Sequence, residues 1–507
     1  MPDWGDLQVD QLRFMAREHG ADVAYRNLDA GTAITFTEWD DRSNQLARAL
    51  VDAGVAPGDR VSIYLPSDEA LRWIVAYAAV HKVGAVVVPT NTRLSIPELV
   101  TILGHAEASA LITCAALLDT ALAVRDAVPS VRFVVTAGGA AGAAVFDYDS
   151  FLAPDASDIQ VPRTLDDLAD IMYTSGTTGL PKGVAVRHRN VAMIPNHEPA
   201  WTAGGWIHGA PMFTFAGIAF IYNPMKMGLV GLYLPKFDAS RWFDLVATEQ
   251  PHMAFLVPAM AELLVAHPRF AERDLSSLRS VSIGSAPLAP QTLLTLQARL
   301  PGATVSNSYG LTEAGPAYIV MPKDEVTKRI GSVGKPVGPM QLKVVREDGD
   351  ECDTREVGEL LTKMDGAQRE YYKDEAATAS TWTADGWLRS GDLAYLDEDG
   401  FLYIAGRKKD MIIRGGHNVY PTDIEAVLLE HPDVQEAAVV GIPHQVLGED
   451  IAAYVVLRDG ASLDPDTLLA FCSERLADYK RPRELHFTSQ LPRNATGKVM
   501  KHKLGVA

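Results

Sequence analysis

The chain has 507 residues and carries 46 Lys and Arg residues against 64 Asp and Glu residues, a formal charge of −18. This acidity counts against a broad nucleic-acid-binding surface, which needs clustered positive charge, and the length favours more than one domain. Three cysteines that lie far apart (Cys114, Cys352 and Cys472) form neither zinc-type spacings nor a disulfide framework, so we expect a reducing, cytoplasmic setting. The N-terminus lacks an apolar signal core, and no uncharged apolar stretch of about 18 residues is present, so no membrane span is expected.

The first part of the chain alternates helix and strand signals. Apolar residues at helical spacing predict helices at 38–54 and 68–82. Short apolar runs bounded by breakers predict strands at 59–64, 84–89, 110–113 and 132–136. This alternation predicts largely parallel sheets covered by helices. The Gly/Ala-rich segment 137–144 is predicted to be a surface loop.

Later segments have a different character. Shorter strand-and-turn pieces at 342–404 predict a small antiparallel β region. After Gly406 a compact segment follows, with predicted helices at 421–431 and 464–477 and predicted strands near 436–442 and 451–457. We therefore expect an α/β fold with a large N-terminal domain at 1–406 and a small α+β C-terminal domain at 407–507.

One segment, Tyr173–Val184, dominates the chemistry and follows a short apolar strand at 170–173. Its glycines let backbone N–H groups turn toward an anion, its hydroxyls add donors, and Lys182 adds positive charge. It is not a Walker loop, because Pro181 replaces the expected glycine and no Gly-Lys-Ser/Thr follows. A plain Gly/Thr-rich turn is the alternative, but the composition favours a polyphosphate-binding loop. Its predicted phosphate-binding residues are Thr174, Ser175, Gly176, Thr177, Thr178, Gly179 and Lys182.

This segment resembles the phosphate loop of the adenylate-forming superfamily, which includes acyl- and aryl-CoA synthetases, luciferases and peptide-synthetase adenylation domains. Further stretches resemble the family's motifs, in the family's order, across nearly the whole chain. They are Gly284–Pro287, Asn307–Glu313, Gly331–Pro336, Trp387–Asp392, Gly406–Gly416 and Pro492–Lys498. Any one match could be accidental, but the joint order is specific.

The resemblance implies an ATP site. Beyond the phosphate loop, the implied ATP-binding residues are Gly284, Ser285, Ala286, Pro287, Asn307, Ser308, Tyr309, Gly310, Thr312, Asp392 and Arg407. The Tyr309 ring would stack on adenine, and Asp392 would accept hydrogen bonds from the ribose hydroxyls. Glu313 would hold Mg²⁺ through carboxylate oxygen. The implied catalytic residues are Lys498, Thr178 and Glu313.

The implied reaction has two halves. A carboxylate attacks the α-phosphate of ATP to give acyl-AMP and pyrophosphate, and a thiol then displaces AMP. The resemblance also implies that the small C-terminal domain is mobile and rotates between the halves about a hinge at Lys409. Gly415 and Gly416 would then face the incoming CoA.

The stretch Pro211–Gly217 matches the family's acyl site, with Phe213, Thr214 and Gly217 as the acyl-binding residues and Gly217 as part of the pocket wall. It departs from the family pattern in two ways that bear on the substrate. Thr214 replaces a frequent His, and no carboxylate is present to pair a substrate amine, which disfavours amino acids. The aromatic residues Trp201, Trp206, Phe213, Phe215 and Tyr222 either line a ring-binding pocket or belong to the core.

A third departure concerns the thiol-transfer half. His417 stands where many relatives have Glu, so contacts in that conformation are not carried over.

The sequence therefore predicts an AMP-forming acyl-CoA ligase, an acid–thiol ligase that uses ATP, Mg²⁺, CoA and a hydrophobic or aromatic carboxylic acid. An adenylating enzyme that passes the acyl group to a carrier-protein thiol or an amine is the alternative. A non-catalytic nucleotide-binding module and a phosphotransferase that yields ADP fit the motifs less well. A homodimer stays open.

Overall fold

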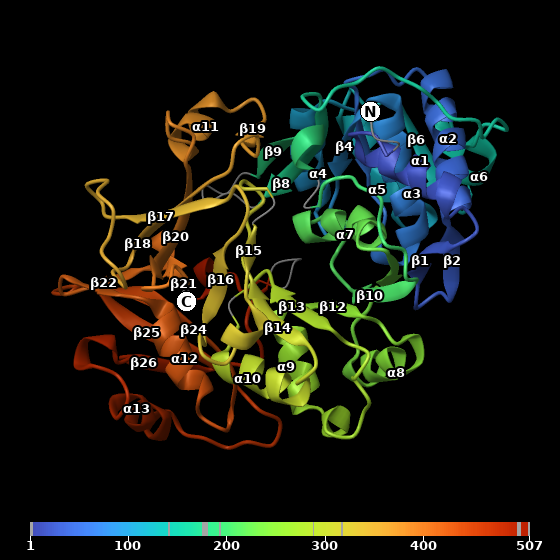
Figure 1. Cartoon of the computed structure of the whole chain (residues 1–507). Helices are drawn as coiled ribbons and strands as arrows, with labels where there is room; N and C mark the ends of the chain where they lie inside the picture. Colours follow the sequence, from blue (N-terminus) through green and yellow to red (C-terminus); the bar gives the residue numbers. More distant parts are fainter. Residues whose placement is uncertain are drawn as a thin grey trace.

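The computed structural model describes residues 4–139, 142–174, 181–191, 194–286, 288–315, 318–493 and 498–504. Four sheets organise this part of the chain, and the described C-terminal residues lie beside the second and third sheets (Figure 1). The α/β fold class predicted from the sequence is confirmed.

The first sheet has the strand order β19-β9-β8-β4-β3-β5-β6-β7. Its strands are β3 (Arg60–Ile63), β4 (Val86–Pro89), β5 (Ala108–Cys114), β6 (Phe133–Ala137), β7 (Val145–Asp147), β8 (Leu168–Thr174), β9 (Lys182–Arg187) and β19 (Glu370–Tyr371). Pairing is parallel from β8 through β4 to β7 and antiparallel where β9 joins β8 and β19. The strands predicted at 59–64, 84–89, 110–113 and 132–136 all lie here. Residues 140 and 141 of the predicted 137–144 loop lie outside the described residues.

The second sheet has the order β14-β13-β12-β10-β11-β1-β2 and is parallel except for the β1–β2 pair. Its strands are β1 (Val23–Asn27), β2 (Thr32–Thr35), β10 (Gly204–His208), β11 (Leu229–Tyr233), β12 (Met253–Leu256), β13 (Ser280–Gly284) and β14 (Thr304–Ser308). Strands β13 and β14 end at Gly284 and Ser308, where two of the predicted nucleotide motifs stand. The carboxyl ends of adjacent parallel strands share one edge, which is a common ligand position in open α/β sheets.

Helices pack against these two sheets (Figure 1). They are α1 (Gln8–Glu18), α2 (Phe36–Asp52), α3 (Ala70–Val83), α4 (Ile96–Ala106), α5 (Leu118–Ala127), α6 (Tyr148–Phe151), α7 (Phe215–Lys226), α8 (Ala239–Glu249), α9 (Pro258–Ala266), α10 (Pro290–Arg299) and α11 (Glu375–Thr381). Helix α2 begins with a capping box, since Thr35 Oγ1 accepts from the Glu38 amide at 3.2 Å and the Glu38 carboxylate accepts from the Thr35 amide at 2.9 Å.

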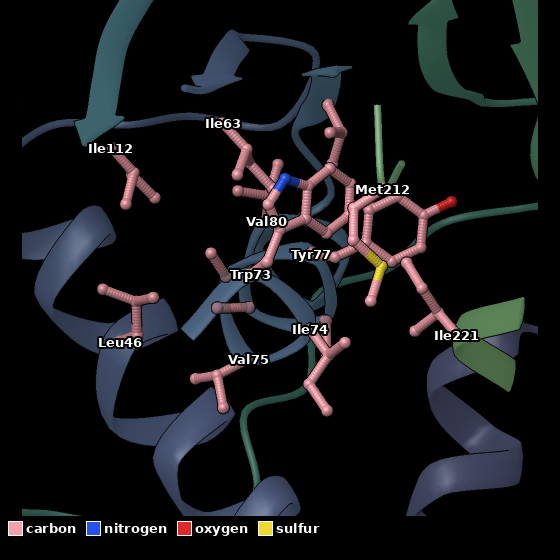
Figure 2. Close-up of a cluster of buried hydrophobic side chains, with 14 of the residues drawn as sticks. Leu46, Ile63, Trp73, Ile74, Val75, Tyr77, Val80, Ile112, Met212 and Ile221 are labelled. Carbon is pink, nitrogen blue, oxygen red and sulfur yellow. The ribbon is translucent and has the colours of Figure 1, made fainter. Parts of the chain in front are cut away.

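Helix α3 is the centre of the largest core and is buried on nearly every side. Figure 2 shows Trp73, Ile74 and Tyr77 of α3 among side chains from α2, β3, β5 and α7. Its buried Lys82 and His81 have partners: Lys82 pairs with Asp40 at 2.6 Å, and His81 lies 3.1 Å from Asp170. The apolar residues from Trp73 to Val83 therefore belong to a helix of the core. In the described part of the chain, no helix is long and apolar enough to cross a membrane.

The third sheet is the predicted antiparallel region, with the order β15-β16-β21-β20-β18-β17. Its strands are β15 (Ile319–Val320), β16 (Ser332–Pro336), β17 (Gln341–Val345), β18 (Gly358–Lys363), β20 (Leu388–Leu396) and β21 (Leu402–Arg407). It begins earlier than the predicted 342–404 range, because two short strands precede Gln341.

The C-terminal sheet has a hydrophobic core of its own, built from residues between Ile412 and Phe487. Its elements are β22 (Ile412–Arg414), β23 (His417–Val419), α12 (Pro421–Leu429), β24 (Val434–His444), β25 (Gly448–Leu457), α13 (Pro465–Ser473) and β26 (Glu484–Phe487). The helix predicted at 464–477 ends at Ser473. Because β21 runs to Arg407, that residue still belongs to the third sheet. The division into 1–406 and 407–507 stays a prediction.

Candidate active site

Strands β8 and β9 form the antiparallel hairpin that carries the predicted phosphate loop. Thr174 pairs with Lys182, and these two residues stand at the two ends of the predicted loop. Ser175, Gly176, Thr177, Thr178 and Gly179 lie outside the described residues, and their role stays a prediction. The Lys182 ammonium lies 5.0 Å from the centre of the Tyr371 ring on β19, a cation–π contact that fixes the cation at the base of the loop.

The turn after β14 carries the predicted acidic residue. Leu311 and Gly315 form an antiparallel bridge that closes the turn around Thr312 and Glu313. The Tyr371 hydroxyl donates to Glu313 Oε1 at 3.2 Å. Burial, together with the Glu313 charge, raises the pKa of Tyr371, so this hydroxyl keeps the proton that it donates.

Tyr371 therefore touches both Lys182 and Glu313, two residues with predicted roles at the phosphates. The motif analysis missed it. Its sequence context, a Tyr-Tyr pair followed by Lys373-Asp374, has no spacing that marks a site.

Asp392 lies at the centre of a buried polar cluster. The Tyr309 hydroxyl donates to Asp392 Oδ2 at 2.5 Å, and Arg407 Nε donates to Oδ1 at 3.1 Å. The pairing of β20 with β21 places Asp392 directly opposite Arg407. A carboxylate has about four acceptor positions, so Asp392 retains capacity for the ribose hydroxyls that the sequence analysis assigned to it.

Lys498 lies close to this cluster. Burial, together with the nearby Arg407 charge, lowers the pKa of Lys498 to about 8, although Asp392 and Asp410 oppose the shift. Residues 494–497 lie outside the described residues, but Lys498 itself is described. The structure thus brings a residue from the end of the chain to the Asp392–Arg407 pair of the third sheet.

The ends of β13 and β14 form the predicted adenine edge. Gly284 is in register with Ser308, and a Cβ on Gly284 would lie 3.1 Å from the Ser308 carbonyl oxygen. Ser285 has a φ of 76°, so the chain makes a left-handed turn directly after the strand and continues to Ala286. Pro287 lies outside the described residues. A hollow of about 280 Å³ adjoins this edge and is lined in part by Asn307 and Ser308, and Gly310 follows them in the next turn.

The predicted acyl stretch begins α7. Thr214 caps the helix, since its hydroxyl accepts from the Gly217 amide at 3.1 Å and donates to the Pro211 carbonyl at 2.7 Å. A Cβ on Gly217 would lie 2.0 Å from that same Pro211 oxygen. The residue is a glycine because the Pro211 backbone leaves no room for a side chain, and its assignment to the acyl wall stays a prediction.

Two of the five aromatic residues proposed for the acyl pocket belong to cores. Trp206 packs with Phe220 and Phe255, and Tyr222 stacks on Trp39 with ring centroids 5.6 Å apart. Of the two interpretations, pocket lining or core, the structure supports the core for Trp206 and Tyr222. Phe213 and Phe215, at the start of α7, are half-buried.

Lys409 lies in a single 3₁₀ turn, Lys408–Asp410, which connects β21 to β22. Gly415 and Gly416 form the two-residue turn between β22 and β23, with φ values of 57° and 83° that favour glycine. The neighbouring His417 ring stacks on Tyr479, with the ring centroids 4.7 Å apart. The hinge role of Lys409 and the CoA-facing role of the glycines stay predictions.

Comparisons with known proteins bear on the whole chain. A family model described as AMP-binding enzyme matches residues 12–372, and one described as AMP-binding enzyme C-terminal domain matches residues 423–498. A feruloyl-CoA synthase from Amycolatopsis sp is 35% identical over 483 residues, which cover 93% of each chain.

Two solved structures are also similar. Anthranilate CoA ligase AuaEII, in complex with anthranoyl-AMP, has a TM-score of 0.89 at 26% identity, covering 99% of this chain and 97% of the other. The amide bond synthetase McbA from Marinactinospora thermotolerans has a TM-score of 0.85 at 28% identity, covering 98% and 99%.

The chain therefore belongs to the AMP-binding enzyme family, the adenylate-forming superfamily that its motifs resemble. The similarity to these relatives extends over nearly the whole length of the chain. Within this family it is an AMP-forming acyl-CoA ligase, with ATP and CoA as substrates.

We expect Gly217→Ala to damage the start of α7 rather than to change acid selectivity, because its Cβ would lie 2.0 Å from the Pro211 oxygen. The variant should unfold at a lower temperature and lose rate to a similar degree with small and bulky acids. Gly302→Ala is the matched control, since no atom lies within 4 Å of a Cβ there. If the ratio of rates for bulky and small acids changed while the melting temperature did not, the result would instead support Gly217 as part of the pocket wall.

The Lys498 pKa of about 8 predicts the pH dependence of adenylation. If the ammonium is the active form, acyl-AMP formation should fall as pH rises through about 8, whereas an ordinary lysine would stay charged to about pH 10. Pyrophosphate release without CoA measures this half alone. In Lys498→Arg the charge persists, so the alkaline fall should disappear, and a wild-type rate that stays flat to about pH 10 would contradict the prediction.

Proposed function

We propose that the chain ligates a hydrophobic or aromatic carboxylic acid to CoA in two half-reactions. The acid attacks the α-phosphate of ATP to give acyl-AMP and pyrophosphate, and the CoA thiol then attacks the acyl-adenylate and releases AMP. The observation that carries this proposal is the position of Lys498 beside Asp392 and Arg407. An ammonium there would offset the negative charge of the carboxylate and the α-phosphate as they approach.

Several features disfavour an α-amino acid as the substrate. The Pro211–Gly217 stretch contributes no carboxylate to pair a substrate amine. Thr214, at the position of the family's frequent His, has its hydroxyl engaged in the α7 cap. The half-buried Phe213 and Phe215 give this stretch an apolar character. The names of similar proteins, which include a feruloyl-CoA synthase and an anthranilate CoA ligase, point to aromatic acids.

Glu313 fits a role in holding Mg²⁺. Its Oε1 accepts from Tyr371, which orients the carboxylate and leaves Oε2 available. No group of three or more His, Cys, Asp or Glu side chains that could hold a metal occurs among the described residues. Mg²⁺ usually takes one or two carboxylates together with substrate phosphates and water, so a single protein carboxylate can contribute to its binding. The ion would supply charge neutralisation at the phosphates.

We also propose that 407–507 reorients as a unit about Lys409 after adenylation. The separate core of the C-terminal sheet supports this, because the unit does not depend on the larger part for its packing. Only a 3₁₀ turn connects it to β21. Reorientation would withdraw Lys498 and bring the Gly415–Gly416 turn toward the acyl-adenylate.

The likeness to an amide bond synthetase favours one alternative acceptor, an amine in place of the CoA thiol. A carrier-protein thiol is the other. The homodimer and the cytoplasmic setting stay predictions from the sequence.

We expect an acid panel to define the substrate class. Pyrophosphate release should be fastest with aryl and hydrophobic acids such as ferulate, anthranilate and octanoate, and slow with α-amino acids such as phenylalanine. The product with CoA should be a thioester and AMP. Repeating the reaction with an amine or with pantetheine tests the acceptor. Formation of ADP, or pyrophosphate release only with amino acids, would refute the proposal.

Two variants should separate the half-reactions. Lys498→Ala should slow acyl-AMP formation by roughly 10²-fold or more, because it removes the charge that meets the α-phosphate. Thioester formation from supplied acyl-AMP should persist. Lys409→Pro should still form acyl-AMP but transfer it slowly, because proline restricts φ at the proposed hinge.

The matched control for the lysine is Lys501→Ala. It removes a cation from the same C-terminal segment, but that cation pairs with Glu425 at 2.7 Å instead of reaching Asp392. Equal loss of both half-reactions in Lys498→Ala and Lys409→Pro would contradict the two-conformation proposal.

A further inference from the structure

Arg369 is a buried cation that no sequence motif marked. Its side chain is among the largest that are fully buried in the described residues, with 2% of the residue exposed. It directly precedes β19, the edge strand that pairs with β9 beside the phosphate-loop hairpin. Arginine is rarely buried without partners, so its contacts indicate why it is there.

The guanidinium binds two carbonyl groups. One terminal nitrogen donates to the Thr312 carbonyl at 2.7 Å, and the other donates to the Asn190 carbonyl. The Asn190 side chain donates in return to the Gln368 carbonyl at 3.1 Å, which fixes the backbone on both sides of this contact. Because the guanidinium is planar and its donors have a fixed geometry, these two bonds set the position of the Thr312 carbonyl.

Anionic and aromatic groups surround the same cation. Burial lowers the pKa of Arg369 to about 10 although the nearby Asp170, Tyr77 and Glu313 oppose the shift, so the guanidinium remains charged at neutral pH. Asp170 is itself buried and accepts from the Tyr77 hydroxyl at 3.0 Å. The guanidinium lies 4.9 Å from the centre of the Phe215 ring at the start of α7.

Gly315 shows how closely the turn packs on this cation. A Cβ on Gly315 would lie 3.2–3.3 Å from atoms of the Arg369 guanidinium, and Gly315 has a φ of 72°. Since Gly315 bridges to Leu311, the whole turn around Thr312 and Glu313 rests on the guanidinium. Two residues further along, Tyr371 binds the Glu313 carboxylate.

We propose that Arg369 is a positioning residue for adenylation, which holds the Thr312–Glu313 turn in the place needed to bind magnesium-bound ATP. This inference rests on the proposed function, in which Glu313 holds Mg²⁺. Arg369 does not touch the substrate in this role. It acts through the Thr312 carbonyl and through the packing of Gly315.

The test is the affinity for nucleotide without any acid, measured by titration calorimetry with Mg·ATP and again with ATP in excess chelator. Arg369→Lys keeps a cation but cannot bind both carbonyls with one planar group. Its affinity for Mg·ATP should fall roughly tenfold or more, the size typical of losing a group that orients a metal ligand. Its affinity for metal-free ATP should fall much less, a difference that a general loss of packing would not produce.

Two further variants make the test specific. Arg369→Lys combined with Glu313→Gln should bind Mg·ATP no more weakly than Glu313→Gln alone, because both changes remove the same contact. Gly315→Ala keeps Arg369 but displaces the turn, so it should show the same magnesium-selective loss. It serves as the test if Arg369→Lys does not fold. Arg355→Lys is the matched control, since Arg355 is an exposed residue paired with Glu398 at 2.9 Å.

The outcomes separate this inference from the proposed function. Unchanged Mg·ATP affinity in Glu313→Gln would overturn the assignment of Glu313 to magnesium. A loss in Glu313→Gln with wild-type affinity in Arg369→Lys and Gly315→Ala would overturn only the role of Arg369. The role of Arg369 would also be overturned if Arg369→Lys lost equal affinity for ATP with and without magnesium. Additive losses of Mg·ATP affinity in the double variant would overturn it as well.

Discussion

The buried carboxylate of Asp392 connects three parts of the chain that are distant in sequence. Tyr309, which follows the last strand of the second sheet, donates to one oxygen, and Arg407, the last residue of β21, donates to the other. Lys498 brings the end of the chain to the same carboxylate. A buried charge is costly unless it is paired, so the β20–β21 register that sets Asp392 opposite Arg407 is a constraint on the whole site.

The turn after β14 is held from both ends by buried groups. At its start, Tyr309 is tied to Asp392; at its far end, Gly315 packs against Arg369, whose guanidinium also binds the Thr312 carbonyl. The chain is strongly acidic overall, with a formal charge of −18. Its positive charge at the site comes from a few cations with fixed positions. Charges interact more strongly away from water, so a few such cations suffice for an anionic ligand.

The sequence predicted most of the fold because its signals were local. Periodicity located α2 and α3, and short apolar runs located β3, β4, β5, β6 and β8 of the first sheet. Ordered motifs located Asp392, Arg407 and Lys498 in segments that the fold brings together. The end of α13 and the close packing of Gly217 were missed, because tertiary contacts decide both. Arg369 and Tyr371 could not be recognised either. Their significance comes from Thr312 and Glu313, more than 50 residues away in the chain, and no local pattern records a contact at that separation.

The connection at Lys408–Asp410 has a consequence for how this protein could be recombined with its relatives. Arg407 is anchored to Asp392 on one side of the turn, and the Thr422 hydroxyl donates to the Ala405 carbonyl across it. An exchange of C-terminal parts made at 408–410 would keep the Arg407 anchor with the host, but the Thr422 contact would have to be supplied by the donor. The donor of the C-terminal part should therefore have a residue with a hydroxyl group at the position of Thr422. Added linker length would be harmful, because Lys498 reaches its cluster through the orientation that this short turn sets.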